Sequence, residues 1–315
     1  MMRRTSKIFF PVTILIIISL WRISSGEWDM KFSEVIRFLL TDSDSPASIV
    51  IRSVRLPRLI CAIFAGGILS VSGVILQGLL ANPLAEPYTL GIASGSAFGA
   101  AIGILFGEFA VMPCAFCGAV CALVLTGIIA GNGGRERLIL AGVISNAVLS
   151  AGVTFMKSIA GEKIGAVVLW LMGSFAGASW RDVWAVISGA VIVSLPAYVT
   201  GNALDAMSLG GERASVLGVN EKFLRVILLV CSSTGVALCV SSFGVIGFVG
   251  LIVPHISRGI VGANHRNVIV HSFVIGAVIM TLADGLAQRL GEIPAGVITA
   301  LTGGPFFCYV LAGKH

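Results

Sequence analysis

Charged residues are scarce in this sequence. Only 11% of its 315 residues are Asp, Glu, Lys or Arg, whereas soluble globular proteins contain about a quarter. So few polar side chains would not cover a globule of this size in water. The scarcity excludes an ordinary cytosolic enzyme and a disordered chain. Despite a net charge of +6, it also excludes a nucleic-acid-binding protein.

Groups that carry chemistry are few as well. The four histidines have no cysteine or carboxylate at metal-ligand spacing, and Cys114 and Cys117 have no second pair to complete a zinc or redox motif. There is no phosphate-binding loop that ends in Gly-Lys-Ser/Thr, and no zinc-protease or serine-hydrolase motif. Few carboxylates lie mid-span, so a proton- or sodium-driven transporter would lack coupling groups. We expect no catalytic residue, no metal, no cofactor held by this chain, and an external energy source.

Apolar residues dominate instead, at 57% of the chain with a mean hydropathy of +1.00. A helix needs about 20 apolar residues to cross roughly 30 Å of hydrocarbon. We therefore predict an all-α polytopic membrane protein, with residues 1–315 forming one domain of about ten spans. The spans are predicted at 8–24, 57–80, 89–107, 110–131, 138–159, 183–201, 223–243, 244–262, 268–288 and 294–312.

The even number of spans places both termini on the same side of the membrane. Arg3, Arg4 and Lys7 precede the first span and indicate that this side is the cytoplasm. Two outer segments are not predicted to span. Residues 30–40 have the apolar spacing of an interfacial amphipathic helix. Residues 164–176 are too short to cross, which favours a re-entrant or half-buried helix.

Some small and polar residues recur inside the spans. Glycines occur every fourth residue from Gly91 to Gly107, a stripe that predicts close packing against a neighbouring helix. Asp284 is expected to pair locally with Arg289. In the fifth span a weakly polar stripe fits two alternatives, a hydrogen-bonded seam between helices or the lining of a pathway. Its residues are Gly142, Ser145, Asn146 and Ser150.

The loop at 203–220 contains more apolar residues than a solvated connector needs. It is predicted to form two short helices that break at Gly210-Gly211 and end at Gly218. Such a loop is expected to dock on its own bundle or on a partner protein.

Several blocks of sequence resemble one family. They include Arg55-Leu-Pro-Arg58, Gly73-Val-Ile-Leu-Gln-Gly78, Asn82-Pro-Leu-Ala-Glu-Pro87, Gly247-Phe-Val-Gly-Leu-Ile-Val-Pro-His-Ile-Ser-Arg258 and Gly303-Gly-Pro-Phe-Phe307. In number and order these blocks resemble the FecCD-type permeases, the membrane subunits of binding-protein-dependent ABC importers for iron chelates, haem and cobalamin. The resemblance runs from about residue 52 to residue 312.

The resemblance implies a type II ABC importer permease in a bacterial inner membrane. Its implied partners are a second permease copy or a homologous permease, two ATP-binding subunits that hold the ATP and Mg, a substrate-binding protein, and membrane lipid. Family breadth alone favours a ferric siderophore as cargo, then haem or cobalamin, with molybdate-type oxyanions remote. The alternative is a stand-alone secondary transporter or channel.

The resemblance also implies roles for residues. The polar stripe would line the translocation pathway, and Asn82, Pro83 and Leu84 would form a cytoplasmic gate. Arg55, Arg58 and Arg289 would dock the binding protein, unless they only extend toward the membrane edge. A loop at about 203–222 would couple to the ATPase through Leu204, Met207, Leu209, Gly210, Glu212, Arg213, Leu217 and Gly218.

Overall fold

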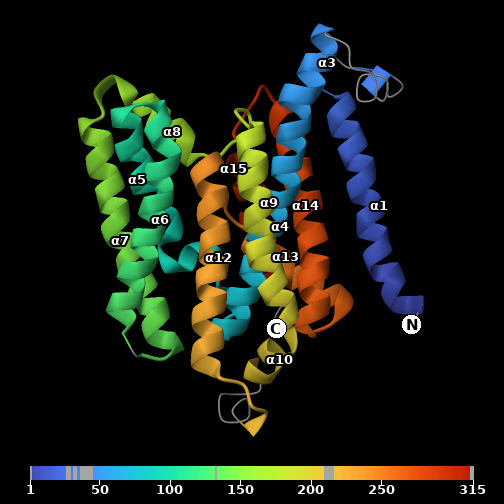
Figure 1. Cartoon of the computed structure of the whole chain (residues 1–315), viewed down its shortest axis with the longest axis vertical. Helices are drawn as coiled ribbons and strands as arrows, with labels where there is room; N and C mark the ends of the chain where they lie inside the picture. Colours follow the sequence, from blue (N-terminus) through green and yellow to red (C-terminus); the bar gives the residue numbers. More distant parts are fainter. Residues whose placement is uncertain are drawn as a thin grey trace.

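The structure, a computed structural model, describes residues 2–25, 30, 34–35, 45–131, 133–208 and 216–312. Within these ranges the regular elements are helices, and the long ones lie side by side along one axis (Figure 1). Their bounds are α1 Met2–Ser24, α3 Pro46–Val50, α4 Leu56–Leu80, α5 Ile92–Phe106, α6 Glu108–Ala130, α7 Arg135–Ile159, α8 Ile164–Leu171, α9 Trp180–Val199, α10 Gly201–Ser208, α12 Glu221–Phe243, α13 Val249–Val261, α14 His265–Arg289 and α15 Ala295–Ala312.

Apolar helices occur at all ten predicted spans. Six helical segments are long and apolar enough to cross a membrane, and four apolar helices are shorter. The short ones include α5 with 15 residues and α13 with 13. We call the lower end of Figure 1 the α10 end and the upper end the α3 end; α1 begins at the α10 end.

Helix α4 forms the centre of the bundle, where α9, α12, α13 and α14 pack around it. Glycines bring these backbones together. A Cβ atom built at Gly66 would lie 2.2 Å from the carbonyl oxygen of Gly276 on α14, and one built at Gly73 would lie 1.9 Å from that of Gly250 on α13. Any larger residue would push these helices apart, so α4, α13 and α14 depend on glycine for their packing.

The glycine stripe of α5 packs against α6, which confirms the predicted close approach. A Cβ atom at Gly95 would lie 2.4 Å from the carbonyl oxygen of Gly118, and one at Gly118 would lie 2.1 Å from that of Gly95. One turn along, a Cβ atom at Gly99 would lie 2.0 Å from the carbonyl oxygen of Cys114. The two helices therefore meet backbone to backbone.

The predicted eighth span begins too early. Residues 244–248 are not helical, and α13 begins only at Val249. Gly244 and Phe248 have positive φ angles of 75° and 68°, which a helix does not accommodate. A Cβ atom at Gly244 would lie 2.1 Å from the carbonyl oxygen of Trp170. The segment therefore leaves the helical conformation where it packs against the end of α8 and the residues that follow it. The predicted third span is also shortened, since Pro87–Leu90 forms a separate 3₁₀ turn before α5.

The segment at 164–176 does not span the bundle. It contains α8, which ends at Leu171, and then a non-helical stretch in which Phe175 is fully buried. The Phe175 ring packs on that of Phe243 with centroids 4.7 Å apart, and Ser174 donates a backbone hydrogen bond to the Phe243 carbonyl at 2.8 Å. Most of the predicted amphipathic helix at 30–40 lies outside the described residues.

Candidate functional sites

A cavity of about 780 Å³ lies at the α10 end. It is lined by Asn82 and Pro83, which follow α4, by Asp205 on α10, and by Leu217, which precedes α12. Asn82 accepts a hydrogen bond from the backbone N–H of Leu84 at 2.9 Å and so closes a tight turn. The structure therefore places two of the expected gate residues beside one of the expected coupling residues.

Asp205 connects α10 to the start of α14. Its carboxylate accepts hydrogen bonds from Asn264 Nδ2 at 2.9 Å and from the His265 backbone N–H at 3.0 Å, and it lies 2.6 Å from His265 Nδ1. The His265 ring in turn lies against α4, where a Cβ atom at Gly78 would be 3.0 Å from Nε2. Asp205 and His265 therefore join α10 and the start of α14 to the end of α4, which the expected gate residues follow.

The expected coupling residues fall into three groups. Leu204 and Met207 are fully buried within the bundle, and Arg135 on α7 holds the Met207 carbonyl at 3.4 Å. Leu217 is 63% exposed and its neighbour Val216 is 87% exposed; Gly218 is also exposed, with a φ of 77°. The remaining four lie outside the described residues: Leu209, Gly210, Glu212 and Arg213.

Three residues of the polar stripe on α7 lie in contacts between helices. Gly142 packs on the Thr89 carbonyl, and Ser145 is fully buried and accepts a hydrogen bond from Thr126 on α6 at 2.9 Å. Asn146 donates to the Tyr88 carbonyl at 3.1 Å and accepts from Ser94 on α5 at 2.7 Å. This part of the stripe is a hydrogen-bonded seam.

Ser150 is the most open residue of the stripe, and it also donates a hydrogen bond to Ser94 on α5 at 3.4 Å. It is exposed and lines a cavity of about 340 Å³ between α5 and α7, together with Ser94, Thr154 and Lys157. Apart from the one lysine, the walls of this cavity are small, weakly polar or apolar, and include Leu171 at the end of α8. Of the four stripe residues, Ser150 is the one that is exposed.

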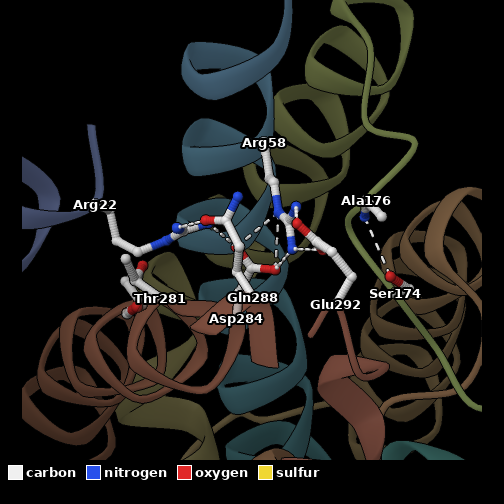
Figure 2. A network of polar contacts seen from close by, with 9 residues as sticks. Arg22, Arg58, Ser174, Ala176, Thr281, Asp284, Gln288 and Glu292 are labelled. Atoms are coloured by element: carbon white, nitrogen blue, oxygen red, sulfur yellow. Dashed lines mark hydrogen bonds and ion pairs between the residues drawn. The ribbon is translucent and has the colours of Figure 1, made fainter. Parts of the chain in front are cut away.

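Near the α3 end, four charged side chains from three helices and a loop form an ion-pair network, and three of the four are buried (Figure 2). Asp284 on α14 pairs with Arg22 on α1 and with Arg58 on α4, where the Arg58 Nη2 to Asp284 Oδ1 distance is 2.9 Å. Arg58 also pairs with Glu292, in the loop before α15, at 2.9 Å. Gln288 accepts a further hydrogen bond from Arg22. The expected local pair of Asp284 with Arg289 is therefore replaced by two long-range pairs.

The two carboxylates of the network differ in exposure. The Asp284 side chain is 1% exposed, whereas that of Glu292 is 41% exposed. Burial alone would raise the pKa of Glu292, but hydrogen bonds and the positive charge from Arg58 lower it below its usual value. The formal charges of the two arginines and two carboxylates cancel, which is the condition for burying them at tolerable cost.

Comparisons with known proteins match this architecture over nearly its whole length. A family model described as the FecCD transport family matches residues 13–313. The chain belongs to the FecCD transport family.

Two relatives and one solved structure agree with this assignment. The FecCD chain is 37% identical to the Fe(3+)-citrate import system permease protein of Bacillus subtilis over 96% of its own length and 94% of the relative's. It is 36% identical to a probable iron chelatin transport system permease protein of Helicobacter pylori strain J99, covering 87% and 86% of the two chains. A structure described as an inward-facing conformation of a metal-chelate type ABC transporter superimposes with a TM-score of 0.87 at 32% identity, covering 98% and 99%. The fold is that of an ABC importer permease.

The three expected docking arginines of this FecCD permease lie near the α3 end but differ in availability. Arg58 is only 5% exposed and holds two carboxylates, so in this structure it does not present its charge to a partner. Arg55 is half-buried and donates to the Ile23 carbonyl at 2.7 Å. Arg289 is exposed; its guanidinium lies 4.9 Å above the Trp21 ring and donates to Ser25 at 3.3 Å. Of the three, Arg289 is the most accessible.

Sequence reasoning missed two members of the network, Arg22 and Glu292. Arg22 lies near the end of the first predicted span, and Glu292 lies in the loop just before the last one. A charge close to the end of an apolar span is ordinarily taken as a residue that extends to the interface. Many other charged residues lie at the same predicted end, so the sequence holds no signal that would have singled out these two.

Proposed function

We propose that this chain is the membrane-spanning subunit of a binding-protein-dependent ABC importer that moves a bulky metal chelate, a ferric siderophore in the first place, across a bacterial inner membrane. ATP would be hydrolysed, with Mg, in two separate ATP-binding subunits, and two permease copies would form the pathway between them. Family membership and the relatives named for iron chelatin and Fe(3+)-citrate support the cargo class.

One observation supports ATPase coupling most directly. Val216 and Leu217 are exposed apolar side chains that precede α12, and Figure 1 shows α12 beginning at the α10 end. Exposed apolar side chains beyond the spanning helices favour a protein contact, and Leu217 also lines the cavity that contains Asn82 and Pro83. We infer that the 203–222 segment is the ATPase-coupling surface and that this end is cytoplasmic.

The contacts of α10 supply a route from that surface to the gate. An ATPase that moves α10 would pull on Asp205, which holds His265, and the His265 ring touches the end of α4. Asn82, Pro83 and Leu84 follow directly on that end. At the α3 end, Arg289 would meet an acidic residue of the substrate-binding protein, a pairing that promotes encounter and register more than affinity.

The test is ATP-driven uptake of a radiolabelled ferric siderophore into proteoliposomes containing the permease, its ATPase and its binding protein. We expect Leu217→Glu to abolish uptake and co-purification of the ATPase while the permease stays in the membrane, and Leu217→Met to behave as wild type. Haem and cobalamin in parallel reactions resolve the cargo. Uptake by the permease alone, without an ATPase, would support the stand-alone transporter and overturn the proposal.

A further inference from the structure

A second cavity faces outward from the side of the bundle. It is a groove of about 500 Å³ between α9 and α14, lined almost wholly by apolar side chains. Val191 and Leu195 form the wall on α9 and are 55% and 59% exposed, and Val270 and Val274 form the wall on α14. We refer to it as the α9–α14 groove. Its volume lies within the range of small-molecule sites.

The floor of the groove is rigid. It consists of Phe64 on α4 and Phe273 on α14, whose rings meet edge to face with centroids 6.1 Å apart. Phe273 lies flat against α4 because Gly67 has no side chain; a Cβ atom there would be 2.4 Å from the Phe273 ring. The groove is therefore a preformed feature of the packing and not a gap left by a mobile side chain.

A positively charged side chain, Arg266, lies beside Tyr198 at the end of the groove that is nearer the α10 end. Arg266 is one turn before Val270 on α14, its guanidinium lies 5.6 Å from the ring centroid of Tyr198, and its Nη2 donates to the Val199 carbonyl at 3.3 Å. Its Nε is buried and has no hydrogen-bond partner among the described residues. The nearby carboxylate of Asp205 is held by Asn264 and His265 and lines the other cavity, at the α10 end.

One more polar group lies inside the groove. The Ser194 hydroxyl is buried and has no hydrogen-bond partner in the part of the chain that the structure describes. It is four residues before Tyr198 on α9, which places it about 6 Å deeper along the helix axis. A ligand that suits these groups has a long apolar chain for the groove and an anionic group at one end for Arg266. About one helical turn from that anionic group it has a hydrogen-bond acceptor for Ser194.

A phospholipid has this order of groups. We propose that the α9–α14 groove binds one acyl chain of a phospholipid, with the phosphate on Arg266 and an ester carbonyl on Ser194, and that it favours anionic over zwitterionic headgroups. The apolar walls alone do not select this lipid, since an acyl chain gains no hydrophobic free energy on moving from bilayer to groove. The Arg266 guanidinium pairs well with the phosphate of either headgroup. The preference comes from the rest of the headgroup, because the choline cation of a zwitterionic lipid is repelled by the guanidinium and an uncharged glycerol is not.

The experiment counts retained lipid. The full chain is reconstituted in nanodiscs with equal amounts of phosphatidylglycerol and phosphatidylcholine, transferred to mild detergent and measured by native mass spectrometry. We expect wild type to retain phosphatidylglycerol in preference to phosphatidylcholine. Arg266→Gln should reduce retained phosphatidylglycerol about fivefold, as expected for one basic residue near an anionic headgroup. Arg137→Gln, at the same end but on α7, should match wild type.

Two further variants address the groove itself. Val191→Trp and Leu195→Trp fill it from an exposed position on α9, so either should lower retention of both lipids while a thermal melt confirms folding. Equal retention by Arg266→Gln and Arg137→Gln would identify ordinary annular lipid and overturn the proposal. A further outcome would also overturn the proposal. If wild type retains no lipid, and Val191→Trp forms a smaller oligomer than wild type, a helix of another protein copy occupies the groove. The assay requires no transport, so failure of the importer proposal leaves its result intact.

Discussion

Asp284 is the residue whose removal tests the ion-pair network most sharply. It is the shared partner of Arg22 and Arg58, and it lies on a third helix, so it connects α1, α4 and α14. Asp284→Asn preserves the shape of the side chain but leaves the two arginines with Glu292 as the remaining carboxylate. The network then carries a net positive charge in a buried site.

The size of the effect follows from burial. Asp284 is 1% exposed and each arginine 6%, and removal of one partner from a buried pair costs about 3–5 kcal/mol. Glu292 provides the matched control because its side chain is 41% exposed, and pairs at that exposure contribute about 0–1 kcal/mol. Asp284→Asn should thus destabilise the protein several times more than Glu292→Gln.

The assay is reversible unfolding by SDS titration in mixed micelles, followed by circular dichroism. The double variant Arg22→Met/Asp284→Asn restores charge balance, because Arg58 and Glu292 remain as a pair. It should recover part of the loss, with a coupling energy of about 1–3 kcal/mol between the two positions. If Asp284→Asn unfolds within 1 kcal/mol of wild type and the two changes are additive, the network does not stabilise the fold as described.

Two more predictions use the same titration. Gly73→Ala should destabilise the protein by at least about 1–3 kcal/mol, because its Cβ atom would lie 1.9 Å from the Gly250 carbonyl oxygen. The control Gly127→Ala, whose Cβ atom would have nothing within 4 Å, should stabilise it by about 0.5–1 kcal/mol. Equal effects of the two substitutions would contradict the packing argument. The pKa of Glu292 is lowered in the folded protein, so its contribution is complete above its ordinary pKa of about 4.3 and is lost as pH falls through the lower folded value. The difference in unfolding free energy between wild type and Glu292→Gln should therefore shrink as the pH falls below about 4. A difference that stays constant with pH would refute this.

The positions of the spanning helices could be predicted because hydropathy is a local property. Each predicted apolar run corresponds to an apolar helix, and the run at 164–176, too short to cross, does not span. The non-helical stretch at 244–248 escaped prediction for the same reason. Its residues are all apolar or glycine, so composition continues unchanged while the backbone turns to pack on Trp170.

Long-range contacts were not predictable in this way. Asp284 and Arg22 are separated by 262 residues, and a single sequence contains nothing that pairs them. The nearer Arg289 was the natural candidate, but it is turned toward Trp21 and Ser25. The polar stripe of α7 could be recognised, but the partners of Ser145 and Asn146 on α6 and α5 are visible only in the structure.

The contact between α5 and α6 has a mechanical consequence. Carbonyl oxygens of α6 fit into the gaps left by Gly95 and Gly99, and a carbonyl oxygen of α5 fits at Gly118. These carbonyl oxygens belong to the backbone and have no rotamers to change. A shift of one helix along the other by one turn would therefore require the two helices to separate first. We therefore expect α5 and α6 to move together as one rigid unit in any rearrangement of the bundle. The pair is joined to the rest of the chain at Gly91, before α5, and at Gly131, after α6, and both residues have positive φ angles.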